Sequence, residues 1–298
     1  MRTKEEAYAK LNLALKVGDK KDGFHELDGI AVTVDLYDTV IVETRRDDKI
    51  ILKPEGLREY VYNCTPTLDN AYKTAQAFCE KYSVGGVNIT VKKNIPLSGG
   101  MGGSSTDAAA VLRAMARLYK IDDDLTPLAN KSGSDTAYLL SGGFARLKGR
   151  GEIITPLAVK PILHFAALYQ DCGVNTADCF KEFDNSGKSV LETEDIDKLQ
   201  NYLCSLENYY DFDEFAKNLC SCKNDLFKAA KTIEPSVEKA FDAVNGLAPS
   251  VTFMTGSGST VCGIFPTEEL ARWATDKLKR AGFNAEYLYS VNNCKFKK

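Results

Sequence analysis

Alternation of apolar and polar positions predicts the β-strands of this chain. In the segment AYAKLNLALKV, residues 7–17, three leucines fall on one face of a strand, and Lys10 and Asn12 fall on the other. The same period, or a short apolar run between turn residues, predicts strands over 30–36, 39–43, 87–93, 144–147, 162–169 and 284–289. Two more strands are predicted within 251–265, on either side of a Gly-Ser turn. Asp22-Gly23 is a turn signal between the first two strands, so the chain opens as an antiparallel β region.

A second period, of about 3.6 residues, predicts the helices. The predicted helices cover 69–82, 107–119, 175–183 and 267–281, with two or three more between residues 195 and 244. The first is amphipathic with Asp69 or Asn70 near its cap, and Asn175-Thr176 caps the third, since such side chains supply the missing acceptor. Residues 45–68 are polar and irregular and give no strand assignment.

The order of these elements predicts an α+β protein with two domains. The second half begins with a strand and a helix, continues mainly with helices, and ends β-β-α-β, which is the split βαβ or ferredoxin-like pattern. Pro156 and Pro161 punctuate the chain between the two halves, shortly after a Gly-Arg-Gly-Glu turn. The sequence therefore predicts an N-terminal domain over residues 1–155 and a C-terminal domain over residues 156–298.

A glycine-rich loop separates the strand at 87–93 from the helix at 107–119. From Ser98 to Thr106 nearly every residue is Gly, Ser or Thr. Glycines let a backbone approach a ligand closely, and the free N–H groups and the dipole at a helix N-terminus attract anions. A flexible loop with hydroxyl caps is the simpler alternative. Four glycines followed by three hydroxyl residues and Asp107 favour a phosphate site instead.

Two common phosphate loops do not fit this segment. The pattern G-x-x-x-x-G-K-[ST] fails because no lysine follows the glycines. The dinucleotide fingerprint G-x-G-x-x-G fails because no glycine follows Gly103 in register. The loop therefore belongs to another class of phosphate site.

Composition narrows the classes of function. The 298 residues carry a formal net charge of −3, which argues against nucleic-acid binding. Nine cysteines without a C-x-x-C pair and only two histidines argue against a zinc site and for reduced thiols. The sequence opens without an apolar signal core and has no apolar run of membrane-spanning length. We expect a cytoplasmic protein, monomeric or homodimeric, with neither nucleic acid nor membrane as a partner.

The glycine loop follows the pattern P-x-x-x-G-[LM]-G-G-x-S-[ST]-[DN]-A-A, which resembles the phosphate loop of the GHMP kinases. Three more parts of the chain, AKLNLAL with DGFHEL, GSDTAYLL with GRGE, and MTGSGSTVCGIF, resemble the 4-diphosphocytidyl-2-C-methyl-D-erythritol kinases of the non-mevalonate isoprenoid route. The resemblance implies an N-terminal nucleotide domain like ribosomal protein S5 domain 2 and a ferredoxin-like C-terminal domain. Phe24 stands where this family commonly has tyrosine, and Ser104 where it has a third glycine, so the added Cβ is expected to restrict the loop.

The resemblance implies ATP and Mg²⁺ as cofactors. The residues expected to hold the ATP phosphates are Pro96, Ser98, Gly99, Gly100, Met101, Gly102, Gly103, Ser104, Ser105 and Thr106. Mg²⁺ would be held mainly by the phosphates, with Ser105 or Thr106 as a direct or water-bridged ligand. Asp107 would instead favour the helix N-terminus through its charge. Lys93 and Asn70 are the candidates for the adenine pocket.

Lys10 and Asp135 are the catalytic residues that the resemblance implies. Kinase catalysis is mainly positioning and charge stabilisation. Asp135 would accept the proton of the substrate hydroxyl, and Lys10 beside it would keep it ionised and stabilise the transferring phosphoryl group. Taken alone, Asp135 in a Gly-Ser-Asp turn is more simply a turn carboxylate, and Lys10 a solvated strand residue.

By the same resemblance, the substrate is a cytidine-diphosphate sugar alcohol, phosphorylated on its 2-hydroxyl group. The residues expected to contact it are Asn12, Phe24, His25, Thr176 and Phe180. His25 would pair with the edge of the cytosine, while Phe24 and Phe180 would stack on its faces. Each of these residues has a structural role as its alternative, and His164, in an apolar run, is expected to be a core residue.

Two other functions stay open at the level of sequence. A GHMP kinase for another small alcohol, such as homoserine or mevalonate, would have no use for Phe24, His25 and Phe180. A catalytically inactive relative that only binds nucleotide would have no use for Lys10 together with Asp135.

Overall fold

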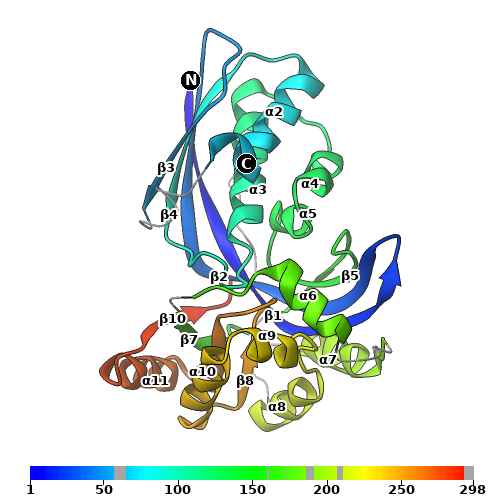
Figure 1. The fold of residues 1–298 in the computed structure, drawn as a ribbon, viewed down its shortest axis with the longest axis vertical. Helices are drawn as coiled ribbons and strands as arrows, with labels where there is room; N and C mark the ends of the chain where they lie inside the picture. Colours follow the sequence, from blue (N-terminus) through cyan, green and yellow to red (C-terminus); the bar gives the residue numbers. More distant parts are fainter. Residues whose placement is uncertain (57–64, 160, 171, 186–190, 207–210, 292–298) are drawn as a thin grey trace. The chain divides into compact units, whose positions relative to one another are not determined.

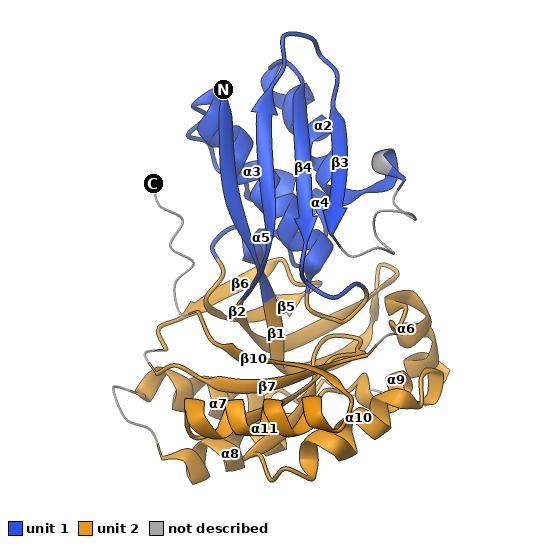
Figure 2. Cartoon of the chain, turned by 90° about the vertical axis from the view of Figure 1, so that its left-hand side faces the viewer, with its two compact units in different colours: residues 1–9, 36–97, 102–141 blue, residues 10–35, 98–101, 142–298 orange. Residues whose placement is uncertain are grey.

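The chain forms two compact units in the computed structural model, which describes residues 1–56, 65–159, 161–170, 172–185, 191–206 and 211–291. Unit 1 comprises residues 1–9, 36–97 and 102–141, and unit 2 comprises residues 10–35, 98–101 and 142–298 (Figure 2). Strands β1 (Arg2–Lys21) and β2 (Phe24–Thr44) each contribute to both units. Neither unit is therefore a continuous segment of the sequence.

Unit 1 is a sheet with helices on one face (Figure 1). Its strands are β3 (Ile51–Gly56), β4 (Val87–Lys93) and the parts of β1 and β2 in this unit. β3 runs parallel to β4, and β4 runs antiparallel to β2, with Val91 opposite Val40. Its helical elements are the short 3₁₀ helix η1 (Pro66–Leu68) and helices α2 (Asn70–Tyr82), α3 (Gly103–Tyr119), α4 (Thr126–Ser132) and α5 (Thr136–Leu139).

Helix α2 follows the sequence pattern closely. The side chain of Asp69 accepts the backbone N–H of Ala71, which satisfies one of the donors left free at a helix start. Ala71, Ala75 and Phe78 repeat at three- and four-residue spacing and are fully buried. The predicted helix and its cap are confirmed.

Helix α3 begins earlier than the sequence pattern predicts. It starts at Gly103 rather than Asp107, and its N-cap is Gly102, which adopts a left-handed conformation with φ 73°. Glycine takes this conformation without the steric cost that a Cβ brings. The hydroxyl residues therefore form the first turn of the helix instead of a loop before it.

Unit 2 contains a four-stranded antiparallel sheet with strand order β10-β7-β9-β8. The strands are β7 (His164–Tyr169), β8 (Val251–Met254), β9 (Val261–Phe265) and β10 (Asn284–Tyr289). The first strand in sequence thus lies between the fourth and the third, which is the split βαβ arrangement. The ferredoxin-like prediction for the C-terminal half is confirmed.

Six helices complete the described part of unit 2. They are α6 (Thr176–Asn185), α7 (Glu194–Ser205), α8 (Phe212–Ser221), α9 (Phe227–Ile233), α10 (Ser236–Asn245) and α11 (Glu268–Arg280). The side chain of Asn175 accepts the N–H groups of Ala177 and Asp178, so the predicted cap of α6 is confirmed. Residues of β7, β9 and the helices α9, α10 and α11 form one buried apolar cluster.

The remaining strands of unit 2 are β5 (Phe144–Gly149), β6 (Ile153–Leu157) and the parts of β1 and β2 in this unit. β5 pairs antiparallel with β2. β6 pairs antiparallel with β5 and is an edge strand. The turn at Asp22-Gly23 that joins β1 to β2 is confirmed, with both residues at positive φ.

Several elements differ from the prediction. The strands predicted at 30–36 and 39–43 are one continuous strand, β2. The described chain has four helices, α7 to α10, where two or three were expected. Helix α4 and strands β3 and β6 were not predicted. β3 contains Pro54 and β6 contains Pro156, and both are edge strands, where a proline costs no ladder hydrogen bond.

Two bulk properties complete the description. The seven cysteines within the described residues are free thiols. Among the helices of the described ranges, none combines the length and apolar character needed to cross a membrane.

Candidate functional site

The glycine loop is shared between the two units. Residues 98–101 belong to unit 2, and residues 102–106 belong to unit 1 as the start of α3. The predicted phosphate loop is therefore built from two parts with different neighbours.

In unit 2, the loop packs backbone to backbone against a second glycine turn at residues 255–258. A Cβ added to Gly100, whose φ is 75°, would lie 2.2 Å from the carbonyl oxygen of Thr255. A Cβ added to Gly256 would lie 2.6 Å from the carbonyl oxygen of Gly100. The N–H of Thr260 donates to the carbonyl of Gly99 at 3.3 Å. Glycine is required on both sides of this contact because the obstacle is backbone, which cannot rotate away.

Strand β1 joins the same contact through Lys10 and Asn12. The backbone N–H of Lys10 donates to the carbonyl of Met101 at 3.0 Å, and that of Asn12 donates to Oγ1 of Thr255 at 2.9 Å. Their side chains meet, with the ammonium of Lys10 donating to Oδ1 of Asn12. Both residues are 5% exposed or less, so Lys10 is not the solvated strand residue that stood as its alternative.

In unit 1, the first turn of α3 carries the hydroxyl residues. Ser104 is exposed and accepts a hydrogen bond from the side-chain amide of Asn70 at 3.1 Å. It lies within the helix, where a Cβ is normal, while the left-handed conformation falls on Gly102. The expected restriction by Ser104 is therefore absent. No side-chain hydrogen bond caps this helix start, because Gly102 has no side chain to offer.

Thr106 lies deeper in the helix than its neighbours. Its side chain is 1% exposed, and its hydroxyl donates to the backbone carbonyl of Tyr8 at 2.8 Å. In this conformation the hydroxyl holds α3 against β1 instead of facing a phosphate or a metal. Ser105, half-buried in the turn before it, is thus the better placed of the two predicted Mg²⁺ ligands.

A buried cluster of three charged residues lies beside the start of α3. The ammonium of Lys93 contacts carboxylate oxygens of Asp38 and, at 2.8 Å, of Asp107. Asp38 also accepts the backbone N–H groups of Asn94 and Ile95 at 2.5 and 2.8 Å. All three charged side chains are 4% exposed or less. Asp107 therefore binds Lys93 in the second turn, instead of acting at the helix N-terminus, and Lys93 is engaged inside the unit rather than lining an adenine pocket.

The cluster holds two carboxylates against one ammonium, and its pKa shifts follow from that. Burial raises the pKa of Asp107, the charge of Lys93 opposes that rise, and the neighbouring charge of Asp38 adds to it. Burial acts to lower the pKa of Lys93, but the two carboxylates outweigh it and raise that pKa. Lys93 therefore stays charged and joins β4 to α3 through its ion pair with Asp107.

Asp135 lies in the predicted turn, where the N–H of Thr136 donates to the carbonyl of Gly133 at 3.1 Å. It is the N-cap residue of α5, yet its side chain does not serve as a helix cap. Gly133 lies close to two hydroxyls, since a Cβ added there would be 3.0 Å from Oγ of Ser105 and from Oγ1 of Thr136. The turn thus lies against the first turn of α3. Asp135 belongs to unit 1 and Lys10 to unit 2, so their predicted pairing stays a prediction.

In unit 2, the structure brings His25 and Phe180 together. Their rings stack with centroids 5.2 Å apart and planes 19° apart. Thr176, one turn earlier on α6, shares a hydroxyl contact of 2.9 Å with Ser257 of the glycine turn. Helix α6 thereby links the residues predicted for the substrate to the turn that packs on the glycine loop.

Phe24 does not join this group. Its ring is 51% exposed and lies under the guanidinium of Arg150, 3.6 Å from ring centroid to Cζ. Neighbouring residues of a strand point to opposite faces, so Phe24 and His25 at the start of β2 face different ways. The aromatic neighbours of His25 in the structure are therefore Phe180 and Phe183, and not Phe24.

His164 is half-buried on β7 and not part of this site. Its Nδ1 lies 2.9 Å from the hydroxyl of Tyr287, and the two rings stack. Burial lowers its pKa, although two glutamates of α11 oppose that shift. The expected structural role fits these contacts.

Sequence reasoning missed Asn224, which organises the second glycine turn. Its side-chain amide donates to the carbonyls of Met254 and Gly256, both at 2.8 Å, and its Oδ1 accepts the N–H of Leu226. Nothing local in the sequence marks an asparagine that acts thirty residues away. It also missed Asp184 on α6, which follows Thr176 and Phe180 at the same four-residue spacing.

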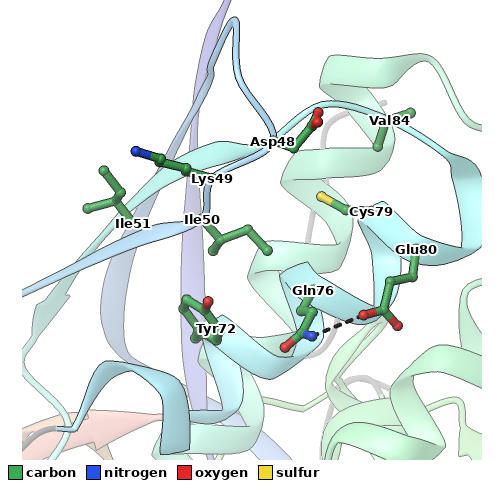
Figure 3. A pocket seen from close by; sticks show the side chains of 9 residues that line it. All are labelled: Asp48, Lys49, Ile50, Ile51, Tyr72, Gln76, Cys79, Glu80 and Val84. Carbon is green, nitrogen blue, oxygen red and sulfur yellow. Dashed lines mark hydrogen bonds between the residues drawn. The ribbon is translucent and has the colours of Figure 1, made fainter.

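A separate pocket of about 510 Å³ lies in unit 1 between the start of β3 and one face of α2 (Figure 3). Its lining includes Tyr72, Gln76, Cys79 and Glu80, with Gln76 donating to Glu80 at 3.0 Å. None of its lining residues is among those predicted for the site. Within the described residues, no group of three or more His, Cys, Asp or Glu side chains could hold a metal ion.

Comparison with known proteins shows the family to which the chain belongs. Residues 69–144 match the GHMP kinases N-terminal domain, and residues 202–284 match the GHMP kinases C-terminal domain. A 4-diphosphocytidyl-2-C-methyl-D-erythritol kinase of Caldicellulosiruptor saccharolyticus is 35% identical over 278 residues, covering 92% of this chain and 91% of its own. One of that name from Macrococcus caseolyticus is 32% identical, covering 92% and 94%.

Solved structures give the same result. A crystal structure of 4-(cytidine 5'-diphospho)-2C-methyl-D-erythritol kinase matches with a TM-score of 0.76 and 27% identity, covering 97% of this chain and all of the other. Homoserine kinase from Cytophaga hutchinsonii matches with a TM-score of 0.77 at 17% identity, covering 98% and 95%, which shows a shared fold. The chain belongs to the GHMP kinase family.

Proposed function

We propose that this protein is an ATP-dependent kinase that phosphorylates the 2-hydroxyl group of 4-diphosphocytidyl-2-C-methyl-D-erythritol, in the non-mevalonate route to isoprenoids. The observation that carries the proposal is the buried Lys10, whose backbone bonds to Met101 of the glycine loop and whose side chain bonds to Asn12. Burying an ammonium group costs free energy, which its hydrogen bond to Asn12 only partly offsets. A buried cation beside the glycine loop suits phosphoryl transfer, in which negative charge develops there. Similarity along nearly the whole chain to kinases of that name supports the choice of substrate.

The nucleotide would bind through the glycine loop. Glycines at 99, 100, 102 and 103 let the backbone approach the phosphates, and the first turn of α3 offers N–H groups and the hydroxyls of Ser104 and Ser105. These hydroxyls suit Mg²⁺ held chiefly by the phosphates, with Ser105 as a direct or water-bridged ligand. When bound, Mg²⁺ neutralises charge on the phosphate oxygens.

Transfer would then need one base and one cation from the chain. Asp135 would accept the proton of the substrate hydroxyl as its oxygen takes the γ-phosphoryl group and ADP leaves. Lys10 would stabilise the negative charge on the transferring group. Asn12, bonded to Lys10, would orient it and contact the substrate.

Base selectivity would arise on the side of His25 and Phe180. Phe180 offers an aromatic face on which a cytosine can stack. His25, whose ring nitrogens face Gly18 and Asp184, would hold that face in place rather than pair with the edge of the base. Homoserine and mevalonate carry no base, so kinases for those alcohols have no use for such a pair. The similarity to homoserine and mevalonate kinases lies between 14% and 17% identity and carries only the fold.

The test of the function is a substrate comparison. ATP consumption is measured with the cytidyl substrate, homoserine and mevalonate side by side. We expect turnover with the cytidyl substrate alone. Turnover with homoserine or mevalonate instead would assign the protein to another GHMP kinase reaction, and none with any of them would favour an inactive nucleotide-binding relative.

A cytoplasmic location and a monomeric or dimeric state belong to this proposal as well. Free thiols at all seven described cysteines suit a reducing compartment.

Gly102→Ala is expected to weaken ATP binding. Gly102 caps α3 at φ 73°, and a Cβ there costs about 1–2 kcal/mol, so the loop is expected to leave this conformation in the free variant. Restoring it on binding would weaken the affinity for ATP by about 5- to 30-fold. The Kd of a fluorescent ATP analogue measures the effect. Gly282→Ala, with φ 86° and open space around the new Cβ, carries the same backbone strain elsewhere and should leave the Kd unchanged. Equal Kd values for both variants would refute the loop assignment.

His25→Ala is expected to impair use of the cytidyl substrate without affecting ATP. Without His25 the ring of Phe180 loses its stacked neighbour and is no longer held in place for the base. By analogy with base readout in nucleic acids, such a loss costs about 1–3 kcal/mol, or about ten-fold or more in kcat/KM. Steady-state kinetics with each substrate varied in turn gives both values. His164→Ala, the other histidine of the chain, is the control. A wild-type kcat/KM for His25→Ala would remove His25 from the site.

A further inference from the structure

One face of α6 carries three residues at four-residue spacing, namely Thr176, Phe180 and Asp184. The first contacts Ser257, the second stacks on His25, and the third lies 3.0 Å from Nε2 of His25 through its Oδ1. Helix α6 is therefore held at both ends, by the glycine turn at its start and by the start of β2 at its end.

The imidazole of His25 is enclosed on every side that the structure describes. Its side chain is 7% exposed, Phe180 covers one ring face, and Phe183 meets it edge-on at 5.7 Å. Nδ1 lies 2.7 Å from the carbonyl oxygen of Gly18 on β1. A carbonyl can only accept, so Nδ1 carries a proton.

The second ring nitrogen faces an ionised acid. Asp184 is paired with Lys20, and that hydrogen bond, together with the charge of His25, holds the pKa of Asp184 below its usual value. Asp184 is therefore a carboxylate, and its Oδ1 lies 3.0 Å from Nε2 of His25. The two ring nitrogens of His25 thus face Gly18 on one side and Asp184 on the other.

We propose that Asp184 and Lys20 are positioning residues for the substrate: the Lys20–Asp184 ion pair, set against Nε2 of His25, fixes the imidazole ring and holds the end of α6 at the β1–β2 hairpin, so that Phe180 is in place before the base binds. This inference rests on the proposed function for the identity of the substrate. Pre-ordering the site in this way lowers the entropy lost on binding. The effect falls on substrate affinity, because neither residue touches the reacting atoms.

The kinetic test uses Asp184→Ala, Asp184→Glu and, as the matched control, Glu182→Ala. Glu182 is a carboxylate on the same helix whose recorded bond is to Asn185. Asp184→Ala should raise the KM for the cytidyl substrate about ten-fold, with kcat and the KM for ATP unchanged. Asp184→Glu should restore part of this, and Lys20→Met should have a smaller effect, because Lys20 is half exposed. An unchanged KM, or equal losses for both substrates, overturns the proposal.

A second measurement does not depend on the substrate. The chain has two histidines, so ¹⁵N spectra of their rings give two sets of signals, with His164 as the internal reference. Asp184→Ala should shift the His25 ring signals and leave those of His164 unchanged, because only His25 contacts Asp184. Should wild-type protein fail to use the cytidyl substrate, the proposed function falls while this spectrum still decides the Asp184–His25 contact. Identical His25 signals in the two proteins overturn the inference.

Discussion

Asp135→Asn is expected to lower kcat by about 10²–10⁴-fold while leaving the KM for ATP nearly unchanged. Asparagine keeps the size of the side chain and much of its hydrogen bonding, but it cannot accept a proton. An equal fall in kcat and kcat/KM marks an interaction made only in the transition state. Steady-state kinetics at saturating ATP, followed by single-turnover measurements, will separate this chemical step from product release.

Asp122→Asn, an exposed turn residue of the same unit, is the matched control and should turn over normally. Lys10→Met should lower kcat as Asp135→Asn does. The double variant should lose less than the product of the single losses, because residues that act as a unit are not additive. Near-normal turnover of Asp135→Asn at saturating substrate would return Asp135 to the role of a turn carboxylate.

Lys93→Met is expected to cost about 3–5 kcal/mol of unfolding free energy, the range found when one partner of a buried ion pair is removed. The substitution leaves the carboxylates of Asp38 and Asp107 buried without their counter-charge. Urea unfolding followed by circular dichroism measures the loss. Lys92→Met is the control, because Lys92 is the neighbouring lysine on the exposed face of β4. It should change the free energy of unfolding by less than about 1 kcal/mol, as is usual for an exposed ion pair.

Asp107→Asn tests the same cluster from its other side. The pKa of Asp107 is raised on folding, so the folded state binds this proton more tightly than the unfolded state. This tighter proton binding stabilises the folded state at low pH. The stabilisation is lost as the pH rises from the ordinary carboxyl range through the raised pKa of Asp107. Asp107→Asn should therefore gain stability relative to the wild type as pH rises. A stability difference that does not vary with pH, or a Lys93→Met protein as stable as Lys92→Met, would contradict the account of the cluster.

Elements with strong periodicity could be predicted from the sequence, and edge strands could not. β4 and α2 alternate or repeat cleanly, because each buries one face against a core. β3 and β6 each carry a proline, and β3 also carries the exposed Lys53; such residues are tolerated where a strand has a free side. The start of α3 was missed because Gly102 replaces the side-chain cap that usually marks a helix N-terminus.

Within the candidate site, local patterns could be predicted and long-range contacts could not. The glycine loop and the shared face of Lys10 and Asn12 are local patterns, so both could be predicted from the sequence. The charged cluster joins Asp38 to Lys93 across 55 residues, and ion pairs of that separation leave no local signal. Asp184 could have been found, since it continues the four-residue spacing of Thr176 and Phe180. The opposite directions of Phe24 and His25 also follow from strand geometry, although the sequence prediction placed both residues at one base.

The discontinuity of the two units constrains how this protein can be recombined with its relatives. The chain passes from one unit to the other at residues 9/10, 35/36, 97/98, 101/102 and 141/142. A chimera with a single crossover, even one placed between the two family regions at 69–144 and 202–284, exchanges no complete unit. Gene shuffling that preserves a whole unit must cross over at all of these points, one of them inside the glycine loop. A recombinant that keeps one unit intact therefore takes the two parts of this loop from different parents.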